Sequence, residues 1–394
     1  MINTLIKNSK ITIFFQPIIS IKDQKIIAYE ALTRAYDEDG GIIMPLFLFA
    51  QAQKENLSSR LDNYVRELAI TKFKSYYKED KSLLLFLNFE SSIIENDNSN
   101  DFIDFVQKSQ INPSNIVVEI KEDSVKETSS LQKFVQKYRG LGFIIAVDDF
   151  GTGYSSFDRL ALIRPDIVKA DRSLIYDVHN NFIHSEILSA ISNMCHKIGA
   201  IVLAEGVESR DEILSCMTKD IDIFQGFWLC KPKDEITAPI KEDIVKNILD
   251  VGAKYRYAMK EHLTKKESFI KNLQELSQKV ISILERSHPE NEQMLSSVVL
   301  EHAKLEAVYI LNEENGIQVG QTIIHSEEKV LYKPTKEGHD HSLKWYYLLA
   351  KDSLSGDYLS SKYISKATGN MCRTYSVKVS IDSITHIVCL DVTE

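Results

Sequence analysis

The stretch FIIAVDDFGTGYSSF, at Phe143–Phe157, contains the pattern that decides the fold. Its first five residues, Phe143–Val147, are apolar throughout, which is typical of a strand that is buried on both faces. Two carboxylates, Asp148 and Asp149, follow at once, and the two glycines after them permit backbone shapes that other residues resist. This order of features predicts a functional site at the carboxyl end of a buried strand.

Seven further apolar runs, mostly separated by segments with helical spacing, resemble this strand. They are Ile11–Ile19, Ile26–Leu32, Leu83–Phe89, Ile116–Ile120, Ile167–Ala170, Ile201–Ala204 and Ile223–Leu229. Apolar strands that alternate with helices indicate parallel strands with helices packed outside them. Eight runs within about 230 residues favour an α/β fold of the TIM (β/α)8 barrel type, with an open doubly wound sheet as the alternative.

Polar side chains recur near the carboxyl end of each apolar run. In chain order they are Gln16, Glu30, Asn88, Glu119, Asp148 with Asp149, Lys169 with Asp171, Glu205 with Glu208, and Gln225. In a barrel of this type the carboxyl ends of the strands meet on one face, where active sites are built. We therefore expect these side chains to converge and to bring several carboxylates face to face.

Such a group of carboxylates requires positive charge nearby, because like charges about 4–6 Å apart raise one another's pKa. Lys169 and Arg34 alone cannot neutralise it, whereas bound cations can. The available ligand atoms are all oxygens, from carboxylates and from the amide of Asn88, and they favour magnesium or manganese over zinc or copper. Adjacent Asp148 and Asp149 suit shared ligation of two ions, and two metals about 3.5–4 Å apart are usual for in-line attack on a phosphodiester.

The same segments resemble those of the EAL domain family, in the same order and each at the end of a strand. They are YEALTR at Tyr29–Arg34, LNF around Asn88, EIKE at Glu119–Glu122, DDFGTGYSSF at Asp148–Phe157, KAD at Lys169–Asp171, AEGVE at Ala204–Glu208 and QGF at Gln225–Phe227. The tripeptide Glu30-Ala31-Leu32 alone would carry no weight, but seven segments in order are a specific signal. The resemblance extends from residue 10 to about residue 235.

The resemblance implies a barrel that hydrolyses cyclic di-GMP to linear pGpG with magnesium or manganese. It implies one ion held by Glu30, Asn88, Glu119 and Asp148, and a second ion held by Asp148, Asp149 and Glu205. It also implies a catalytic centre in which Lys169 contacts the attacking water beside Asp149 and Glu205. The substrate would be held by Gln16 and Arg34. Three further residues would support it: Gln225, Asp171 and Glu208. Calcium accepts more ligands at longer distances than magnesium, so we expect it to allow substrate binding while inhibiting cleavage.

In this family the DDFGTG loop connects the metal site with a dimer contact, and Glu122 resembles the residue that anchors the loop. The chain is therefore expected to form a homodimer. Two departures from the family pattern stand close to the site: Glu90 replaces a small hydroxyl residue, and Lys121 replaces a threonine. Neither departure removes an expected metal ligand.

The composition is that of a globular, intracellular protein. Hydrophobic residues make up 44% and charged residues 26%, and the net charge of −9 disfavours binding to DNA or RNA polymers. The five cysteines are scattered without a CxxC pair, the N-terminus lacks the features of a signal peptide, and apolar runs are too short to span a bilayer. We therefore expect a cytoplasmic protein without a membrane segment.

The rest of the chain is expected to form a helical connector over residues 241–289 and a smaller α+β domain over residues 290–394, after a barrel over residues 1–240. Two apolar stripes run along the connector, and they are out of phase around Lys265, which fits two helices or one long helix. The stripes fit either ordinary packing against a core or a dimeric connector. The segment Tyr358–Val379 resembles sensor modules of the PAS and Cache type, which implies a regulatory domain with an unknown ligand or partner.

Two other classes of function compete with a phosphodiesterase. The stronger alternative is a catalytically weak or inactive EAL domain that senses cyclic di-GMP, and the weaker one is a protein-interaction scaffold. The triplet Asp149-Phe150-Gly151 also occurs in protein kinases, but the chain has no glycine-rich phosphate loop and no HRD segment. Turnover of cyclic di-GMP separates the phosphodiesterase from the sensor, and binding of the nucleotide separates the sensor from the scaffold.

Overall fold

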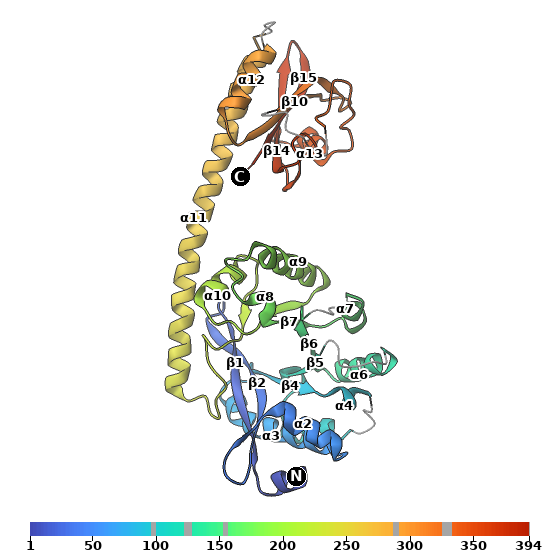
Figure 1. The fold of residues 1–394 in the computed structure, drawn as a ribbon, viewed down its shortest axis with the longest axis vertical. Helices are drawn as coiled ribbons and strands as arrows, with labels where there is room; N and C mark the ends of the chain where they lie inside the picture. Colours follow the sequence, from blue (N-terminus) through green and yellow to red (C-terminus); the bar gives the residue numbers. More distant parts are fainter. Residues whose placement is uncertain (96–99, 122–127, 153–156, 287–290, 325–332, 394) are drawn as a thin grey trace. The chain divides into compact units, whose positions relative to one another are not determined.

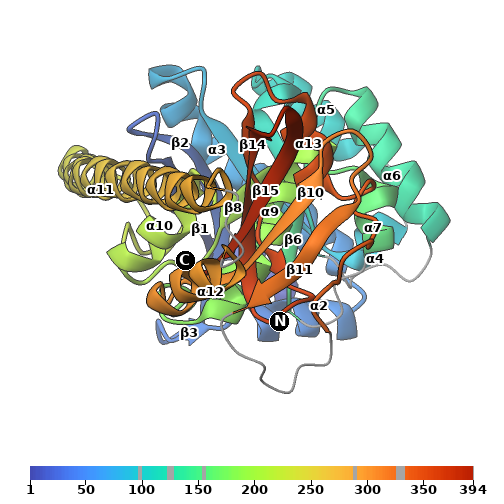
Figure 2. The ribbon, with the colours of Figure 1, turned by 90° about the horizontal axis from the view of Figure 1, so that it is seen from above.

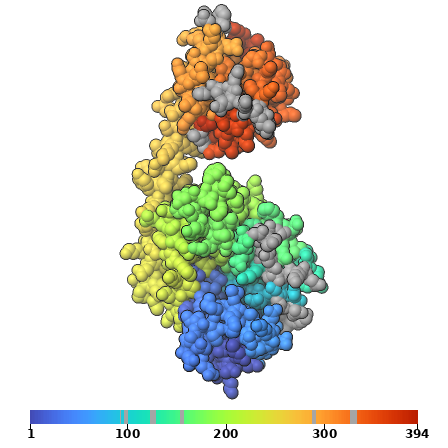
Figure 3. All heavy atoms as spheres, in the orientation of Figure 1, coloured from blue at the N-terminus to red at the C-terminus, as the bar shows by residue number. Residues whose placement is uncertain are grey.

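The computed structural model describes residues 1–95, 100–121, 128–152, 157–286, 291–324 and 333–393. These residues form two compact units, Met1–Met259 and Lys260–Glu394. The colours of Figure 3 run from blue to yellow through the first unit and from yellow to red through the second. Among the described residues, no helix is both long enough and apolar enough to cross a membrane.

The first unit is a closed barrel of eight strands, which confirms the predicted fold and excludes the open sheet. The strands are β1 (Ile11–Ser20), β2 (Lys25–Tyr36), β4 (Leu84–Phe89), β5 (Ile116–Lys121), β6 (Ile144–Phe150), β7 (Ile167–Ala170), β8 (Ile201–Ala204) and β9 (Ile223–Phe224). Their order around the barrel is β1-β9-β8-β7-β6-β5-β4-β2, and pairing of β1 with β2 closes it. The two-residue strand β3 (Ile42–Ile43) extends the sheet beside β2.

One strand does not follow the expected parallel pattern. Strand β1 is antiparallel to both of its neighbours, β2 and β9, whereas the remaining barrel strands are parallel. The reason is the short connection between β1 and β2, because only four residues join them and a parallel pair needs a much longer crossover. Gln16 consequently lies in the middle of its strand, opposite Glu30 of β2.

Helices surround the barrel on its outer side (Figure 1). They are α1 (Ile2–Lys7), α2 (Pro45–Lys54), α3 (Ser58–Glu79), α4 (Ser91–Glu95), α5 (Asp101–Ser109), α6 (Thr128–Gly140), α7 (Phe157–Ile163), α8 (Arg172–Ile175), α9 (Phe182–Ile198) and α10 (Arg210–Met217), with one 3-10 turn at Pro113–Asn115. The main core lies between the strands and these helices, and a smaller apolar cluster fills the inside of the barrel. The apolar side chains on both faces of the strands explain why the runs in the sequence are continuous.

The connector is a single helix, α11 (Ala238–Leu284), rather than two helices. Its first stripe, with Ile244, Ile248 and Val251, packs into the core of the first unit. Its second stripe, with Leu273 and its neighbours, packs into the core of the second unit. The residues between the stripes, 260–268, are exposed. The stripes thus serve as ordinary packing surfaces within each unit.

The second unit contains an antiparallel sheet, in agreement with the α+β domain expected for this part of the chain. The strands are β10 (Leu305–Asn312), β11 (Gln318–Ile324), β12 (Asp357–Leu359), β13 (Tyr363–Ile364), β14 (Met371–Ile381) and β15 (Ile384–Val392). Their order is β11-β10-β15-β14-β12, with β13 paired to β14, and Figure 2 shows β10, β15 and β14 as neighbouring strands. The end of α11 and helix α12 (Asn291–Glu301) share one core with the sheet, and α13 (Trp345–Asp352) shares a second.

Candidate active site in the barrel

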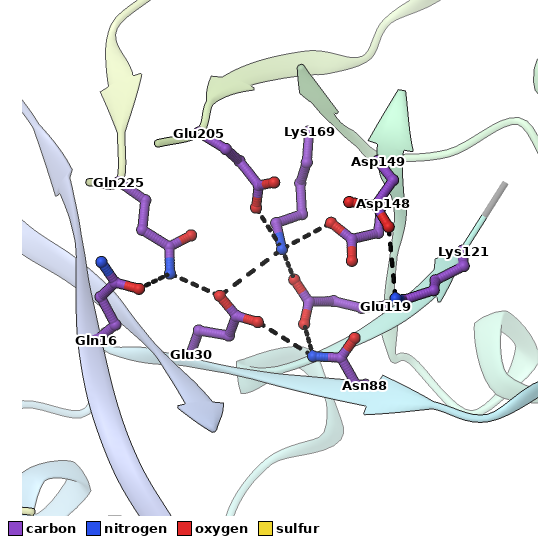
Figure 4. A network of polar contacts seen from close by, with 10 residues as sticks. All are labelled: Gln16, Glu30, Asn88, Glu119, Lys121, Asp148, Asp149, Lys169, Glu205 and Gln225. Carbon is purple, nitrogen blue, oxygen red and sulfur yellow. Dashed lines mark hydrogen bonds and ion pairs between the residues drawn. The ribbon is translucent and has the colours of Figure 1, made fainter. Parts of the chain in front are cut away.

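The barrel strands bring most of the predicted polar side chains together at one end of the barrel. Figure 4 shows nine of them together with Lys121. They come from the strands β1, β2, β4, β5, β6 and β7 and from the residues directly after β8 and β9: Gln16, Glu30, Asn88, Glu119, Lys121, Asp148, Asp149, Lys169, Glu205 and Gln225. Because seven of the barrel strands are parallel, their carboxyl ends lie on the same face, and the antiparallel β1 contributes from its middle. The convergence expected from the sequence is therefore present.

Lys169 on β7 lies at the centre of this cluster and is only 1% exposed. Its ammonium nitrogen lies 2.9 Å from Asp148 Oδ1 and 2.6 Å from Glu205 Oε1, and it also pairs closely with Glu119. A fourth carboxylate, that of Glu30, lies 3.8 Å away. One buried cation therefore contacts carboxylates from four different strands or strand ends.

Two side-chain amides hold Glu30 in place. Asn88 donates hydrogen bonds to Glu30 Oε1 at 3.1 Å and to Glu119 Oε2 at 2.9 Å. Gln225 donates to Glu30 Oε2 at 2.6 Å and to Gln16 Oε1 at 3.2 Å. Both oxygens of Glu30 are thus fixed by amides from other strands.

The adjacent carboxylates of Asp148 and Asp149 reach the same region because the backbone is irregular there. In a regular strand successive side chains point to opposite faces. Here Asp149 adopts a left-handed backbone conformation, with φ of 59°, and the pairing of β6 with β7 shifts between Val147 and Phe150. Ligand atoms of Asp148, Asp149 and Glu205 consequently lie within 4.8 Å of one another.

Three carboxylates of this cluster, those of Glu119, Asp149 and Glu205, have raised pKa values. Burial, together with the charge of Glu30, raises the pKa of Glu119 well above its usual value, and burial raises the pKa of Glu205 to about 8. Burial and the neighbouring Asp148 also raise the pKa of Asp149. Burial alone would lower the pKa of Lys169, but the surrounding carboxylates raise it well above its usual value. Fully ionised, these carboxylates would carry more negative charge than one lysine neutralises, which is why their pKa values are raised.

This surplus of buried oxygen ligands fits divalent cations. Asp148, Asp149 and Glu205 form a set whose oxygens are close enough to share one ion. These donors are carboxylate oxygens, which magnesium and manganese prefer, while Asn88 turns its amide nitrogen toward Glu30 and Glu119. The cations would satisfy the charge that the protein leaves unneutralised.

A second lysine stands at the edge of the cluster. The ammonium of Lys121 lies 3.5 Å from Asp149 Oδ2, and both side chains are partly exposed. Lys121 stood out in the sequence only as a departure from the family pattern, and its contact with Asp149 was not expected. The contact arises because the end of β5 lies beside the end of β6, where Lys121 pairs with Asp148 in the sheet.

Four predicted residues lie outside the central cluster or outside the described part of the chain. Arg34 lines a cavity with Glu30 and Asn88, while its guanidinium donates to the Thr33 carbonyl at 2.8 Å. Asp171 accepts a hydrogen bond from the Ser173 amide and so caps helix α8. Glu208 forms an exposed ion pair with Arg172 at 2.8 Å. Glu122, the predicted loop anchor, lies outside the described residues.

The sequence reasoning missed a buried ion pair beside this cavity. Asp62 and Arg66 pair on helix α3, both side chains are 3% exposed, and both line the cavity that contains Arg34. Burial raises the pKa of Asp62 to about 6, although Arg66 opposes the shift. The guanidinium of Arg66 also lies 4.1 Å from the ring centre of Phe89. The signal in the sequence was an acidic and a basic residue four positions apart on the apolar face of a helix.

Comparisons with known proteins agree with this site. Residues 1–232 match the profile of a family described as the EAL domain. The uncharacterised EAL-domain-containing protein YkuI of Bacillus subtilis is 24% identical over 92% of this chain and 90% of that protein. The cyclic di-GMP phosphodiesterase PdeA of Borreliella burgdorferi is 28% identical over 58% of this chain, which spans 34% of PdeA.

Solved structures show the same fold. A crystal structure of Bacillus subtilis YkuI in complex with substrate c-di-GMP and calcium covers 100% of this chain and 99% of that one, with a TM-score of 0.84 and 21% identity. A structure of Klebsiella pneumoniae BlrP1 with manganese and the cyclic dinucleotide covers 57% of this chain and 56% of that one, with a TM-score of 0.51 and 26% identity. The first similarity extends through the whole chain, and the second covers part of it.

Proposed function

This chain belongs to the EAL domain family, and from that premise we propose that it hydrolyses cyclic di-GMP to linear pGpG with two divalent cations, magnesium or manganese. The observation that carries the proposal is the cluster of carboxylates around Lys169, whose ammonium alone does not neutralise them. Relatives named as cyclic di-GMP phosphodiesterases, such as PdeA, support the choice of substrate.

The expected ligands divide into two overlapping sets. Glu30, Asn88, Glu119 and Asp148 would hold one ion, and Asp148, Asp149 and Glu205 would hold the other. When bound, such ions lower the pKa of water and neutralise charge that develops on a phosphodiester. The short distances among Asp148, Asp149 and Glu205 support the second set.

The chain's own residues would position the substrate and the attacking water. Lys169 is buried and charged, so its ammonium can hold a water molecule and stabilise negative charge beside Glu205 and Asp149. Gln225 donates to both Gln16 and Glu30, and the two glutamine amides would contact the substrate phosphate. Arg34 would contribute a positive charge from the cavity wall. Asp171 would assist in substrate binding, and Glu208 and Glu122 would support the surrounding loops.

We also propose that the barrel acts as a homodimer and that the second unit regulates it. The support for the dimer is the DDFGTG segment, which begins at the end of β6 and resembles the loop of family members that lies at dimer contacts. The support for regulation is that α11 belongs to the cores of both units. A change in the second unit can therefore act on the same helix that packs against the barrel.

A second candidate function is binding without cleavage. The contact of Lys121 with Asp149 favours it, because an ammonium beside a carboxylate competes with a cation for that ligand. In this case the chain would bind cyclic di-GMP tightly and release it unchanged. The seven sequence motifs of the family and the presence of every expected metal ligand favour the enzyme.

The two functions are separated by a turnover assay of the full chain. Cyclic di-GMP is incubated with the protein in magnesium, in manganese and after chelation, and the products are separated by chromatography. If the chain is a phosphodiesterase, we expect pGpG to form with either metal and no pGpG to form after chelation. Binding in calorimetry without any pGpG in either metal would contradict the proposal and support the sensor.

A further inference from the structure

The second unit contains a cavity of about 550 Å³ that no part of the proposed phosphodiester chemistry uses. It lies on the side of the sheet covered by α13, and its wall includes the aromatic side chains Tyr309, His341, Tyr346 and Tyr363. Its charged residue with a buried side chain is Asp391 of β15, which is 3% exposed. A cavity of this size can hold a small organic molecule.

The Asp391 carboxylate is built into a network of hydroxyl groups. Its Oδ1 accepts hydrogen bonds from Thr374 at 2.7 Å, from Tyr363 at 3.1 Å and from Tyr309 at 3.3 Å. Its Oδ2 accepts from Ser365 at 3.1 Å. A carboxylate oxygen can accept more than one hydrogen bond, so Oδ2 has capacity for a further donor whereas Oδ1 is saturated.

His341 adds no positive charge to the cavity. Gln318 donates through its Nε2 to the Gly320 carbonyl at 3.1 Å and to the Thr322 hydroxyl at 2.9 Å, so its Oε1 faces His341 Nε2 at 3.1 Å. An amide oxygen only accepts, and Nε2 of His341 must therefore carry the ring proton. Its Nδ1 then accepts from the Tyr346 hydroxyl at 2.8 Å.

The electrostatics of His341 agree with this hydrogen-bond pattern. Burial lowers the pKa of His341 to about 4, so the ring is neutral near pH 7. The Tyr309 ring stacks on it with ring centres 5.5 Å apart. Tyr346 and Tyr363 form a second stacked pair at 6.3 Å. The cavity thus presents neutral aromatic rings beside one buried carboxylate, a combination that attracts a cation.

We propose that this cavity binds a small primary amine in its ammonium form, with an N–H group donated to Oδ2 of Asp391 and the aromatic rings around the charge. The open acceptor position on Oδ2 selects an amine with N–H groups over a quaternary ammonium. Lys344 and Lys366 also line the cavity, but Lys366 is exposed and Lys344 is half-buried, so solvent screens them more than it screens Asp391. The proposal does not depend on the activity of the barrel.

The test is calorimetry on the full chain with a matched set of small probes. The set contains methylammonium, propylammonium and 2-phenylethylammonium, the neutral 2-phenylethanol, and the N,N,N-trimethyl form of 2-phenylethylammonium. Loss of a charge-assisted hydrogen bond corresponds to about tenfold in affinity or more. We therefore expect at least one primary amine to bind, with 2-phenylethanol and the trimethyl form about tenfold weaker than 2-phenylethylammonium. Absence of binding by every primary amine, or equal binding of the alcohol, would overturn the proposal.

Two variants locate the site. Ser361→Trp places a large side chain at an exposed residue of the cavity wall, and Leu354→Trp is the matched control at an exposed residue outside it. We expect Ser361→Trp to weaken amine binding about tenfold or more, because the indole fills space, while Leu354→Trp binds as the unmodified chain does. Unchanged amine affinity in Ser361→Trp, with both variants unfolding at the same temperature, would place the amine elsewhere and refute the assignment.

Asp391→Asn removes the charge itself and tests the chemistry. We expect it to lose the preference for 2-phenylethylammonium over 2-phenylethanol, since the amide retains the size of the carboxylate without its charge. Circular dichroism during heating shows whether the variant is folded. A folded variant that keeps the tenfold preference would contradict the role of Asp391.

Discussion

The two units each bury carboxylates, but they neutralise them in opposite ways. In the barrel, four carboxylates converge on the single ammonium of Lys169, and a fifth, Asp149, lies beside them. In the second unit, one carboxylate, Asp391, accepts hydrogen bonds from four neutral hydroxyl groups. The barrel cluster has a surplus of charge that calls for ions, whereas the Asp391 network is nearly complete without any.

This difference separates a site for chemistry from a site for binding. Like charges held together in a buried place are costly unless cations join them, so their presence indicates a metal centre. Burial raises the pKa of the Asp391 carboxyl, its four hydroxyl donors oppose that rise, and the carboxylate can still accept one further donor. The variants and conditions below act on one cluster and leave the other as an internal control.

The largest effect is expected from removal of a metal ligand in the barrel. Glu30→Ala and Asp149→Asn should each reduce turnover of cyclic di-GMP by about 10³-fold or more, because the charge stabilisation that metal ions supply amounts to several kcal/mol. Asp243→Asn, which alters an exposed carboxylate on α11, is the control and should keep full activity. Turnover near the unmodified level in Glu30→Ala would show that the ligands are misassigned.

The next effect concerns the central cation of the barrel. Lys169→Met leaves its carboxylates without their buried partner, and we expect the metal-free barrel to lose about 3–5 kcal/mol of stability. Manganese should restore much of this loss, since it supplies the missing charge. Asp391→Asn should destabilise the second unit with no recovery in manganese. Calorimetric unfolding with and without manganese measures the stability of each variant. Equal recovery of Lys169→Met and Asp391→Asn in manganese would contradict the difference proposed between the two clusters.

A smaller effect is expected when calcium replaces magnesium. Calcium binds with more ligands and looser geometry, so cyclic di-GMP should still bind while turnover falls by about 100-fold. Parallel calorimetry and product analysis on the same sample separate binding from cleavage. Full turnover in calcium alone would show that the reaction tolerates a loose metal geometry.

The smallest effect is a pair of opposite pH dependences. The pKa of Glu205 is raised to about 8, so the folded metal-free barrel holds a proton that the unfolded chain releases, and its stability falls as pH rises from about 4.5 to 8. The pKa of His341 is lowered to about 4, so the second unit loses stability as pH falls from about 6.5 to 4, by on the order of 2 kcal/mol. Calorimetry in chelator should show the two transitions moving in opposite directions. Movement in the same direction would contradict these assignments.

Much of the barrel was predictable because each strand is an apolar run with a polar residue at its end. The antiparallel direction of β1 was not expected, although the four residues between β1 and β2 contain the reason for it. The position of Asp149 was expected, but its left-handed backbone was not, since aspartate occurs in many conformations. The pairing of Lys121 with Asp149 depends on the register of two strands distant in sequence, which no local pattern contains.

The second unit was harder to interpret in advance. Its strands follow from alternating apolar residues, but the residues of the Asp391 network are distant in the sequence and carry ordinary hydroxyl groups. The stripes on α11 were compatible with packing inside each unit or with a dimer contact. Burial of Leu273 and Val280 in the core of the second unit accounts for the second stripe without a partner chain.

The central claim is that the barrel cluster holds two divalent ions, and counting them tests it most directly. Equilibrium dialysis of the full chain against manganese, without cyclic di-GMP because the proposed enzyme would hydrolyse it, gives the number of ions bound per chain. We predict two ions for the unmodified chain and one for Asp149→Asn, because Asp149 belongs to one of the two ligand sets only. A single ion in the unmodified chain, or two ions in both proteins, would contradict the account.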